Sequence, residues 1–350
     1  MNILSLFWGI ECGRVALDRA WISVDKYFSS EIDPYAIKIT RANYPDIVHI
    51  GDIKSISSMN RWWNKFICYH EWINRAMQMI QYNQIDLLIW GSPCQDLSIA
   101  KKNWKGLDWE KSGLFYEYVR ILREVKPKYF LLENVASMKP ADRDKISEIL
   151  REVYPDTELH TFDSSLTSAG RRKRHYWTNI PWITPPEDQG IFLKDILEDI
   201  PLSDPMWKPV RPEYLETLRS MPWWMTEMNK VGKIRQGYEF FYPESKVSSF
   251  TVAHARNRKI IIWVPKKSLA ISASYAKKNQ QNFFLKSEWQ MILARDDMEY
   301  YARKLTVREW ARVMNLPDTF IFPVADTNAY HWLGNGWDAG MITHILSFIP

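Results

Sequence analysis

The chain has 350 residues, of which 46% are hydrophobic and 25% are charged, and its formal net charge is +5. This length allows a sizeable buried core, and the mild positive charge permits a polyanionic partner without requiring one. No run of about 18 apolar residues is present and the N-terminus lacks the features of a secretory signal, so we expect no membrane span and a cytoplasmic location. The three cysteines, Cys12, Cys68 and Cys94, form no C-x-x-C pair. A disulfide framework and a structural zinc site are therefore not indicated.

Strand-like and helix-like segments alternate along the first half of the chain. Short apolar strands are predicted to end at Gly9, near Glu31 and before Asp52, and two more lie within 84–93 and 128–135. Helical patterns fill the segments 12–21, 33–45, 58–83 and 112–128. This alternation predicts an α/β fold with a doubly wound, mostly parallel sheet and helices on both of its faces.

The composition of the sequence changes after residue 181, where closely spaced prolines interrupt every long helix or strand pattern. We place a boundary there and expect a smaller, irregular region from 183 to about 300, with one strand-like segment at 258–265. Helical patterns return at 305–317 and in the apolar stretch 339–349.

Candidate reactive residues follow the predicted strands, because ligands of open α/β sheets bind outside the carboxyl ends of the strands. Cys94 comes directly after a Gly-Ser-Pro turn and could act as a nucleophile. A single cysteine beside an apolar run is, however, more often a small buried side chain. The surrounding residues must therefore decide between the two interpretations.

Three further side chains favour the chemical interpretation. Glu133 ends another apolar strand at the same sheet edge and could donate a proton or a hydrogen bond to a ring nitrogen. Arg172 and Arg174 lie on one side of an extended segment. A thiol, an acid and two arginines together suit attack on an electron-poor ring.

Five motifs in consistent order carry a resemblance to a known family. They are "GSPCQDLS" at 91–98, "ENV" at 133–135, "RRKR" at 171–174, "RKLTVREWARVMNLPDTF" at 303–320 and "HWLGNGWDAG" at 331–340. With these motifs the chain resembles the cytosine-C5 DNA methyltransferases. The segment "LFWGIECGRVAL" at 6–17 looks closer to the animal de novo branch, whereas 305–318 looks bacterial. The resemblance implies a bacterial or bacteriophage enzyme, with or without a partner restriction nuclease.

The resemblance implies a class I fold that binds S-adenosylmethionine and a reaction that proceeds through a covalent bond from Cys94 to C6 of cytosine. In this scheme Glu133 holds N3 and the exocyclic amine, Arg174 contacts O2, and Arg172 supports the flipped nucleotide or its phosphate. A free thiol has a pKa of about 8.5, so nearby lysines and arginines would assist its ionisation. The implied cofactor residues are Phe7, Gly9, Ile10, Gly13, Glu31, Asp52, Ile53, Pro93, Asn335 and Trp337. Among these, Glu31 would accept the ribose hydroxyls and Asp52 the adenine amine.

Double-stranded DNA is the partner that the resemblance implies, with the target base turned out of the helix. The loop 95–113 has the length and lysines of a lid over that base. The expected DNA-contacting residues are Ser98, Lys101, Lys102, Arg256, Asn257 and Arg258, of which the last three could read base edges or bind phosphates. We expect a catalytic domain at 1–182, a target-recognition domain at 183–303 and a C-terminal return into the catalytic domain at 304–350.

Some positions depart from the family pattern and leave alternatives open. The glycine-rich turn carries Trp8, Glu11 and Cys12, which together with Arg14 raises the possibility of a modified sulfonium cofactor, and the sequence after Asn335 also differs. Transfer RNA is an alternative substrate, because one branch of the family acts on it. A homologue that binds DNA without catalysis is the other alternative, although such proteins typically lose the thiol or the cofactor acids.

Overall fold

The structure is a computed structural model, and the part of the chain that it describes has several gaps. It describes residues 1–7, 9–55, 57–58, 65–68, 78–81, 85–91, 113–201, 203–209, 250–255, 258–263, 291–296 and 299–350. Several residues singled out from the sequence lie outside these ranges, namely Trp8, Pro93, Cys94, Ser98, Lys101, Lys102, Arg256 and Asn257. Most of the expected lid at 95–113 also lies outside them.

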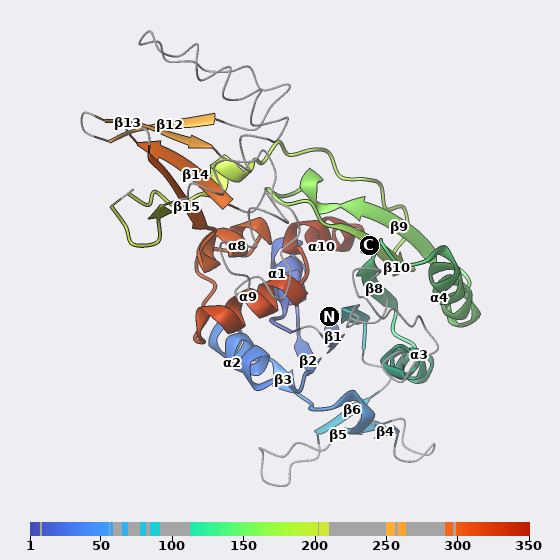
Figure 1. Ribbon diagram of the computed structural model, residues 1–350. Helices are drawn as coiled ribbons and strands as arrows, with labels where there is room; N and C mark the ends of the chain where they lie inside the picture. Colours follow the sequence, from blue (N-terminus) through green and yellow to red (C-terminus); the bar gives the residue numbers. More distant parts are fainter. Residues whose placement is uncertain are drawn as a thin grey trace.

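A seven-stranded mixed sheet forms the centre of the protein (Figure 1). Its strands, in spatial order, are β3 (Val48–His49), β2 (Lys26–Ser30), β1 (Asn2–Leu6), β7 (Leu87–Gly91), β8 (Tyr129–Val135), β10 (Lys173–Thr178) and β9 (Glu158–Asp163). Pairing from β3 through to β8 is parallel, and β10 pairs antiparallel with both of its neighbours. The predicted doubly wound, mostly parallel sheet is therefore confirmed.

The central strands are mostly apolar and almost entirely buried because both of their faces are covered. All seven residues of β8 are buried, and in β7 the four residues before Gly91 are buried as well. Near-continuous hydrophobic runs of this kind are typical of strands in a parallel sheet that is packed on both sides. The register pairs Gly91 with Glu133, which fixes the end of β7 beside the acid of β8.

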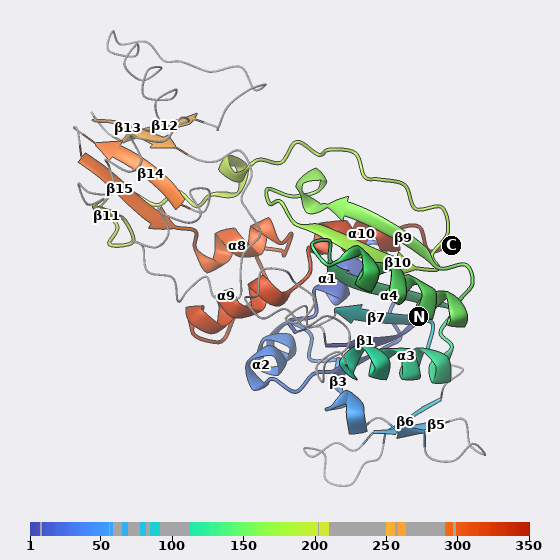
Figure 2. The same cartoon turned by 45° about the vertical axis from the view of Figure 1, so that its right-hand side comes forward.

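Two hydrophobic cores lie on the two faces of the sheet, and Figure 2 shows the helices that cover them. One core includes side chains of α1 (Cys12–Arg19), α2 (Pro34–Asn43) and α10 (Ala339–Leu346), and the other those of α3 (Gly113–Val125) and α4 (Pro140–Val153). The last helix of the chain thus packs in the same core as the first. Helix α2 begins where the sequence indicates, because Asp33 accepts hydrogen bonds from the N–H groups of Tyr35 and Ala36 and Pro34 occupies the first turn.

The helix predicted for 58–83 is wrong. The structure instead has a three-stranded antiparallel sheet of β4 (Ser57–Ser58), β5 (Lys65–Cys68) and β6 (Gln78–Gln81). The sequence of the two longer strands, "KFIC" and "QMIQ", is rich in aromatic, β-branched and other apolar residues that also suit strands. Periodicity alone does not separate short apolar strands from a helix.

A second sheet, antiparallel throughout, occupies the region expected to be irregular. Its strands, in spatial order, are β11 (Lys208–Pro209), β15 (Glu299–Lys304), β14 (Met291–Asp296), β13 (Arg258–Trp263) and β12 (Phe250–Ala255). The strand predicted at 258–265 corresponds to β13, but the other strands were not predicted. Charged residues inside "MILARD" and "EYYARK" interrupt the apolar alternation that indicates a strand.

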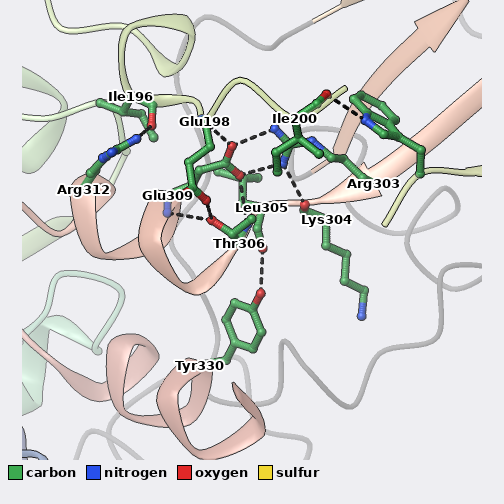
Figure 3. A network of polar contacts seen from close by, with 11 residues as sticks. Ile196, Glu198, Ile200, Arg303, Lys304, Leu305, Thr306, Glu309, Arg312 and Tyr330 are labelled. Atoms are coloured by element: carbon green, nitrogen blue, oxygen red, sulfur yellow. Dashed lines mark hydrogen bonds and ion pairs between the residues drawn. The ribbon is translucent and has the colours of Figure 1, made fainter. Parts of the chain in front are cut away.

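The chain leaves this second sheet through β15 and enters α8 (Val307–Val313) and then α9 (Asp326–Asn335). At this junction Arg303 and Glu309 form a fully buried, two-pronged ion pair, with both N···O distances at 2.7 Å (Figure 3). Glu309 also accepts the backbone N–H groups of Glu198 and Thr306, so that it joins the segments on either side of the second sheet. A helix long and apolar enough to cross a membrane is absent from the described ranges.

Candidate active site

The site lies at the edge of the sheet where the direction of strand order reverses. From β1 the chain proceeds to β2 and β3 on one side, whereas β7 and β8 lie on the other side. Crevices at such a switch point bind ligands in open α/β sheets. The turn from Phe7 to Gly13 follows β1, Glu31 follows β2, and Asp52 follows β3, while Glu133 lies near the end of β8. The strand ends therefore bring these residues to one edge, as expected.

Glu133 and Arg174 form an ion pair at this edge. The distance from Nε of Arg174 to Oε1 of Glu133 is 2.8 Å, and the two side chains are only 13% and 7% exposed. Antiparallel pairing of β8 and β10 produces this contact, because Arg174 stands opposite Val135, two residues from Glu133. Nη1 of Arg174 also donates to the carbonyl oxygen of Lys173 at 2.9 Å. A carboxyl group and a guanidinium held side by side offer both acceptors and donors to the polar edge of a bound ring.

Arg172 has a different environment from the one expected. Its guanidinium is buried and donates to the carbonyl oxygens of Gly336 at 2.7 Å and Gly334 at 3.4 Å. These carbonyls flank Asn335 at the end of α9. Arg172 thus holds the C-terminal segment, a contact that the sequence motif gave no reason to expect.

The turn after β1 adopts a backbone conformation that few residue types favour. Phe7, Gly9 and Glu11 have φ values of 58°, 59° and 57°, in the left-handed region. For Phe7 and Glu11 this conformation costs of the order of 1 kcal/mol or more each, so other contacts must hold the turn. The N–H of Gly9 donates to Oε2 of Glu31 at 3.1 Å, and its carbonyl oxygen accepts from Thr40 at 3.3 Å.

Glu31 and Asp52 present carboxylates after two neighbouring strands. Oε1 of Glu31 accepts two backbone N–H groups, from Ile32 and Asp33, and burial raises the pKa of this carboxyl above its ordinary value. Oε2 accepts the Gly9 N–H, and because a carboxylate oxygen can accept more than one hydrogen bond, it can also accept a ligand hydroxyl. Asp52 is exposed, and its Oδ1 accepts the N–H of Lys54 at 2.9 Å.

The other expected cofactor residues differ in exposure. Ile10 and Ile53 are fully buried in the cores on opposite faces of the sheet, so only their backbones can reach a ligand. Gly13 is buried in the first turn of α1, and Asn335 is exposed with its amide 3.0 Å from Nε2 of His331.

Glu11 is a buried acid whose structural role was missed by sequence reasoning. Its carboxylate accepts hydrogen bonds from the hydroxyls of Ser5 at 2.9 Å and Tyr27 at 2.6 Å, and from Ser29. Burial raises its pKa to about 7, against the opposing effect of these three hydroxyls. Glu11 therefore fastens the turn to β1 and β2. The alternation of Ser5, Tyr27 and Ser29 with apolar strand residues was the signal for a buried polar partner.

Arg14 and Cys12 also differ from what a reactive role requires. Arg14 pairs with Asp18 and, at 3.6 Å, with Asp46, so its charge is balanced within its own surroundings. Burial raises the pKa of the Cys12 thiol to about 12, which keeps it protonated at neutral pH. Cys12 is therefore unsuited to act as a nucleophile.

Two tryptophans of the C-terminal segment pack on glycines of the site. A Cβ atom built on Gly9 would lie 2.7 Å from the Trp332 ring, and one built on Gly91 would lie 2.7 Å from Nε1 of Trp337. Larger residues at either glycine would collide with these rings. Within the described ranges, no group of three or more His, Cys, Asp or Glu side chains is arranged to hold a metal ion.

Comparison with known proteins identifies the family. A family model described as "C-5 cytosine-specific DNA methylase" matches residues 1–160 and 233–349. The Type II methyltransferase M1.ScrFI of Lactococcus lactis subsp. cremoris is 30% identical over 356 residues, which covers 95% of this chain and 74% of that relative. The Type II methyltransferase M.HpaII of Haemophilus parainfluenzae is 26% identical over 349 residues, covering 95% and 85% of the two chains.

Solved structures support the fold. The S. pombe Dnmt2 methyltransferase has a TM-score of 0.57 at 17% identity, covering 99% of this chain and 97% of that chain. A putative DNA modification methyltransferase encoded within an E. coli prophage has the same TM-score at 19% identity, covering 99% and 98%. These likenesses establish the class I methyltransferase fold. The family model matches most of the length of this chain, and the chain therefore belongs to the C-5 cytosine-specific DNA methylases.

Proposed function

We propose that this protein transfers a methyl group from S-adenosylmethionine to C5 of cytosine in double-stranded DNA. The observation that carries the proposal is the ion pair of Glu133 and Arg174 beside the end of β7, because the chain reaches Cys94 three residues after Gly91. A nucleophile, an acid and an arginine would then converge on one ring.

Each residue has a defined part in the proposed reaction. The thiolate of Cys94 adds to C6 of the ring, while Glu133 holds N3 and the exocyclic amine and Arg174 contacts O2. These contacts stabilise the charge that the addition places on the ring's polar edge. S-adenosylmethionine, when bound, supplies the methyl group that C5 takes up. Loss of the proton from C5 and departure of the Cys94 thiolate then restore the ring.

The donor and acceptor chemistry of the site fits S-adenosylmethionine. Its ribose hydroxyls and adenine amine are hydrogen-bond donors, and the carboxylates of Glu31 and Asp52 are acceptors at adjacent strand ends. The other proposed binding residues are Phe7, Gly9, Ile10, Gly13, Ile53, Pro93, Asn335 and Trp337. Glu11 and Arg14 are engaged by protein groups, which favours the ordinary cofactor over a modified one.

DNA contacts are proposed for two segments of the chain. Ser98, Lys101 and Lys102 would contact DNA from the loop after Cys94, which would close over the extruded base. Arg256 and Asn257, which in sequence lie between the paired residues Ala255 and Arg258, would contact DNA together with Arg258. We therefore propose residues 183–303 as the target-recognition domain, between a catalytic domain at 1–182 and its return at 304–350.

Nucleoside analysis tests this function. The purified protein and its Cys94→Ala variant are incubated with S-adenosylmethionine and unmethylated phage DNA, and the digested nucleosides are analysed by mass spectrometry. We expect 5-methylcytosine from the native protein and none from Cys94→Ala. The Cys68→Ala variant is the matched thiol control and is expected to retain activity. A parallel reaction with transfer RNA separates the two substrate classes.

Two outcomes would contradict the proposal. Methylation by Cys94→Ala at the native rate would exclude the thiol mechanism. An absence of 5-methylcytosine from DNA together with its presence in transfer RNA would assign transfer RNA as the substrate.

A further inference from the structure

Ser30, the last residue of β2, connects the segments that follow three neighbouring strands. It is 1% exposed, and its hydroxyl donates to the carbonyl oxygen of Gly51 at 2.8 Å. Its own carbonyl oxygen accepts the N–H of Phe7 at 3.0 Å, and the next residue in the chain is Glu31. The turn after β1, the acid after β2 and the segment after β3 therefore meet at this serine.

The Ser30 hydroxyl continues the contact between β2 and β3 beyond their backbone pairing. The last paired residues are Ser29 and His49, and the N–H of Ile50 then donates to the carbonyl oxygen of Ser29 at 2.9 Å. Gly51 comes next with a φ of 74°, a left-handed conformation that glycine adopts without strain. Because the hydroxyl binds the carbonyl oxygen of this glycine, Ser30 fixes the point at which the chain leaves the sheet.

Asp52 lies between two residues that are held in place. On one side, Gly51 is bound by the Ser30 hydroxyl. On the other side, Ile53 is fully buried in the core that includes α3, and its carbonyl oxygen accepts a hydrogen bond from Arg120 of that helix at 3.4 Å. Asp52 itself is exposed, so the position of its carboxylate depends on the backbone on its two sides.

Glu31 is held separately, on the other side of Ser30. Its carboxylate accepts the N–H groups of Gly9, Ile32 and Asp33 at 3.1, 2.8 and 2.9 Å. The hydroxyl of Ser30 therefore links the strand end that carries Glu31 to the segment that carries Asp52. An adenosine group is stiff, so its ribose hydroxyls and its amine can reach two carboxylates together only if the separation of these carboxylates matches.

We propose that Ser30 is a positioning residue for S-adenosylmethionine, whose hydroxyl sets the separation of the Glu31 and Asp52 carboxylates. This inference rests on the proposed function, in which these two acids receive the ribose hydroxyls and the adenine amine. A site that holds its groups in place before the ligand arrives avoids the cost of ordering them on binding. Loss of the hydroxyl releases the Gly51 carbonyl, and Asp52 then moves away from the amine.

A double-mutant cycle with Asp52 tests this role. Calorimetric titration with S-adenosylhomocysteine, the reaction product, measures the affinity of the cofactor site without turnover. We expect Ser30→Ala to raise the Kd by about tenfold, which is the size of one hydrogen bond to a charged group. In the Asp52→Ala background the same substitution should change the Kd by less than about twofold, because the group that Ser30 positions is absent. An equal rise in both backgrounds would overturn the proposal.

A ligand analogue tests the same coupling from the other side. The analogue is S-adenosylhomocysteine with hydrogen in place of the adenine amine, so it has no amine to donate to Asp52. Its Kd should be the same for the native protein and Ser30→Ala within about twofold. An equal loss of affinity for both ligands would mean that the substitution disturbs the cofactor site in general, which would contradict the positioning of Asp52.

Ser147 provides a matched control. It is also a buried serine, and its hydroxyl donates to the carbonyl oxygen of Arg143 at 2.9 Å within α4. Ser147→Ala should leave the Kd for S-adenosylhomocysteine at its native value, and thermal unfolding of each variant verifies that it is folded. A rise of the Kd in Ser147→Ala equal to that in Ser30→Ala would contradict a specific role of Ser30.

The native protein is titrated with S-adenosylhomocysteine and assayed for methylation in the same experiment, which separates the two proposals. An absence of binding, or of 5-methylcytosine from the native reaction, would contradict the proposed function. Binding and methylation by the native protein together with an unaltered Kd in Ser30→Ala would contradict the positioning role alone.

Discussion

Arg174 lies 2.8 Å from Glu133 across two antiparallel strands, and both side chains are largely buried at the edge of the sheet. A pair of this kind places a carboxylate and a guanidinium at a fixed separation before any substrate arrives. Preorganised polar groups of this kind stabilise charge in a reaction without having to reorganise during it. The pair is therefore the structural centre of the proposed chemistry.

Substitution in this pair is expected to affect rate more than folding. Glu133→Gln keeps the shape of the side chain but removes its charge and acidity, and we expect the single-turnover methylation rate to fall by about 100-fold or more. Arg174→Lys retains the charge but loses the guanidinium fork, and a decrease of about tenfold or more is expected. The exposed neighbour Arg171 supplies the control, since Arg171→Lys should leave the rate nearly native. Equal decreases of the methylation rate in Arg174→Lys and Arg171→Lys would contradict this role of the pair.

Glu11 is expected to make stability depend on pH. Its pKa is about 7 in the folded protein against an ordinary value of 4.5, so the folded state retains a proton that the unfolded state has released between these values. The free energy of unfolding should therefore decrease as pH rises from about 4.5 to about 7 and gain nothing from this group above that range. The decrease is of the order of 3 kcal/mol.

Comparison with Glu11→Gln isolates this effect, because glutamine keeps the polar contacts but does not titrate. The difference in unfolding free energy between the native protein and the variant should slope across this range in denaturant titrations. The exposed Glu187, changed to Gln, should show no such slope. If the difference in unfolding free energy between the native protein and Glu11→Gln did not vary with pH in this range, the buried carboxyl would not change its protonation on unfolding.

The sequence predicted the parallel part of the central sheet because β1, β7 and β8 are mostly apolar and the predicted strands alternate with helical patterns. It failed at 58–83, where short strands with polar and apolar residues intermixed resemble a helix in period. It also failed at β14 and β15, which pair with each other although charged residues interrupt their apolar alternation. The acids Glu31, Asp52 and Glu133 could be located from the sequence, because the order and direction of the strands bring the strand ends to one edge of the sheet. The contacts of Arg172 and Trp337 could not be predicted, since they depend on how α9 and α10 return to the sheet.

The contact of Arg172 with the C-terminal segment around Asn335 can be tested by substitution. Arg172→Met removes both hydrogen bonds to the carbonyl oxygens that flank Asn335. We expect KM for S-adenosylmethionine to rise about tenfold or more, while KM for DNA changes less, because the segment carries the proposed cofactor residue. Initial rates at varied concentrations of each substrate measure both constants. A rise confined to KM for DNA would instead support the phosphate contact that the motif resemblance implied.

The buried ion pair of Arg303 and Glu309 is expected to dominate the stability of the junction with the second sheet. Glu309→Gln leaves a buried guanidinium without its full partner, and we expect a loss of about 3 to 5 kcal/mol in unfolding free energy. The more exposed pair of Arg312 and Asp318 is the control, since Asp318→Asn should cost less than about 1 kcal/mol. Similar losses for the two substitutions, measured by denaturant unfolding, would contradict this assignment.

The central claim, that Cys94 forms a covalent bond with cytosine, is tested most directly with a target duplex containing 5-fluorocytosine. Fluorine at C5 cannot leave as a proton does, so the adduct should persist after methyl transfer. Intact-mass analysis under denaturing conditions should show the protein joined to DNA only when S-adenosylmethionine is present, and peptide mapping should place the bond at Cys94. An adduct at Cys12 or Cys68, or no adduct on a duplex that the protein methylates when it contains ordinary cytosine, would contradict the mechanism.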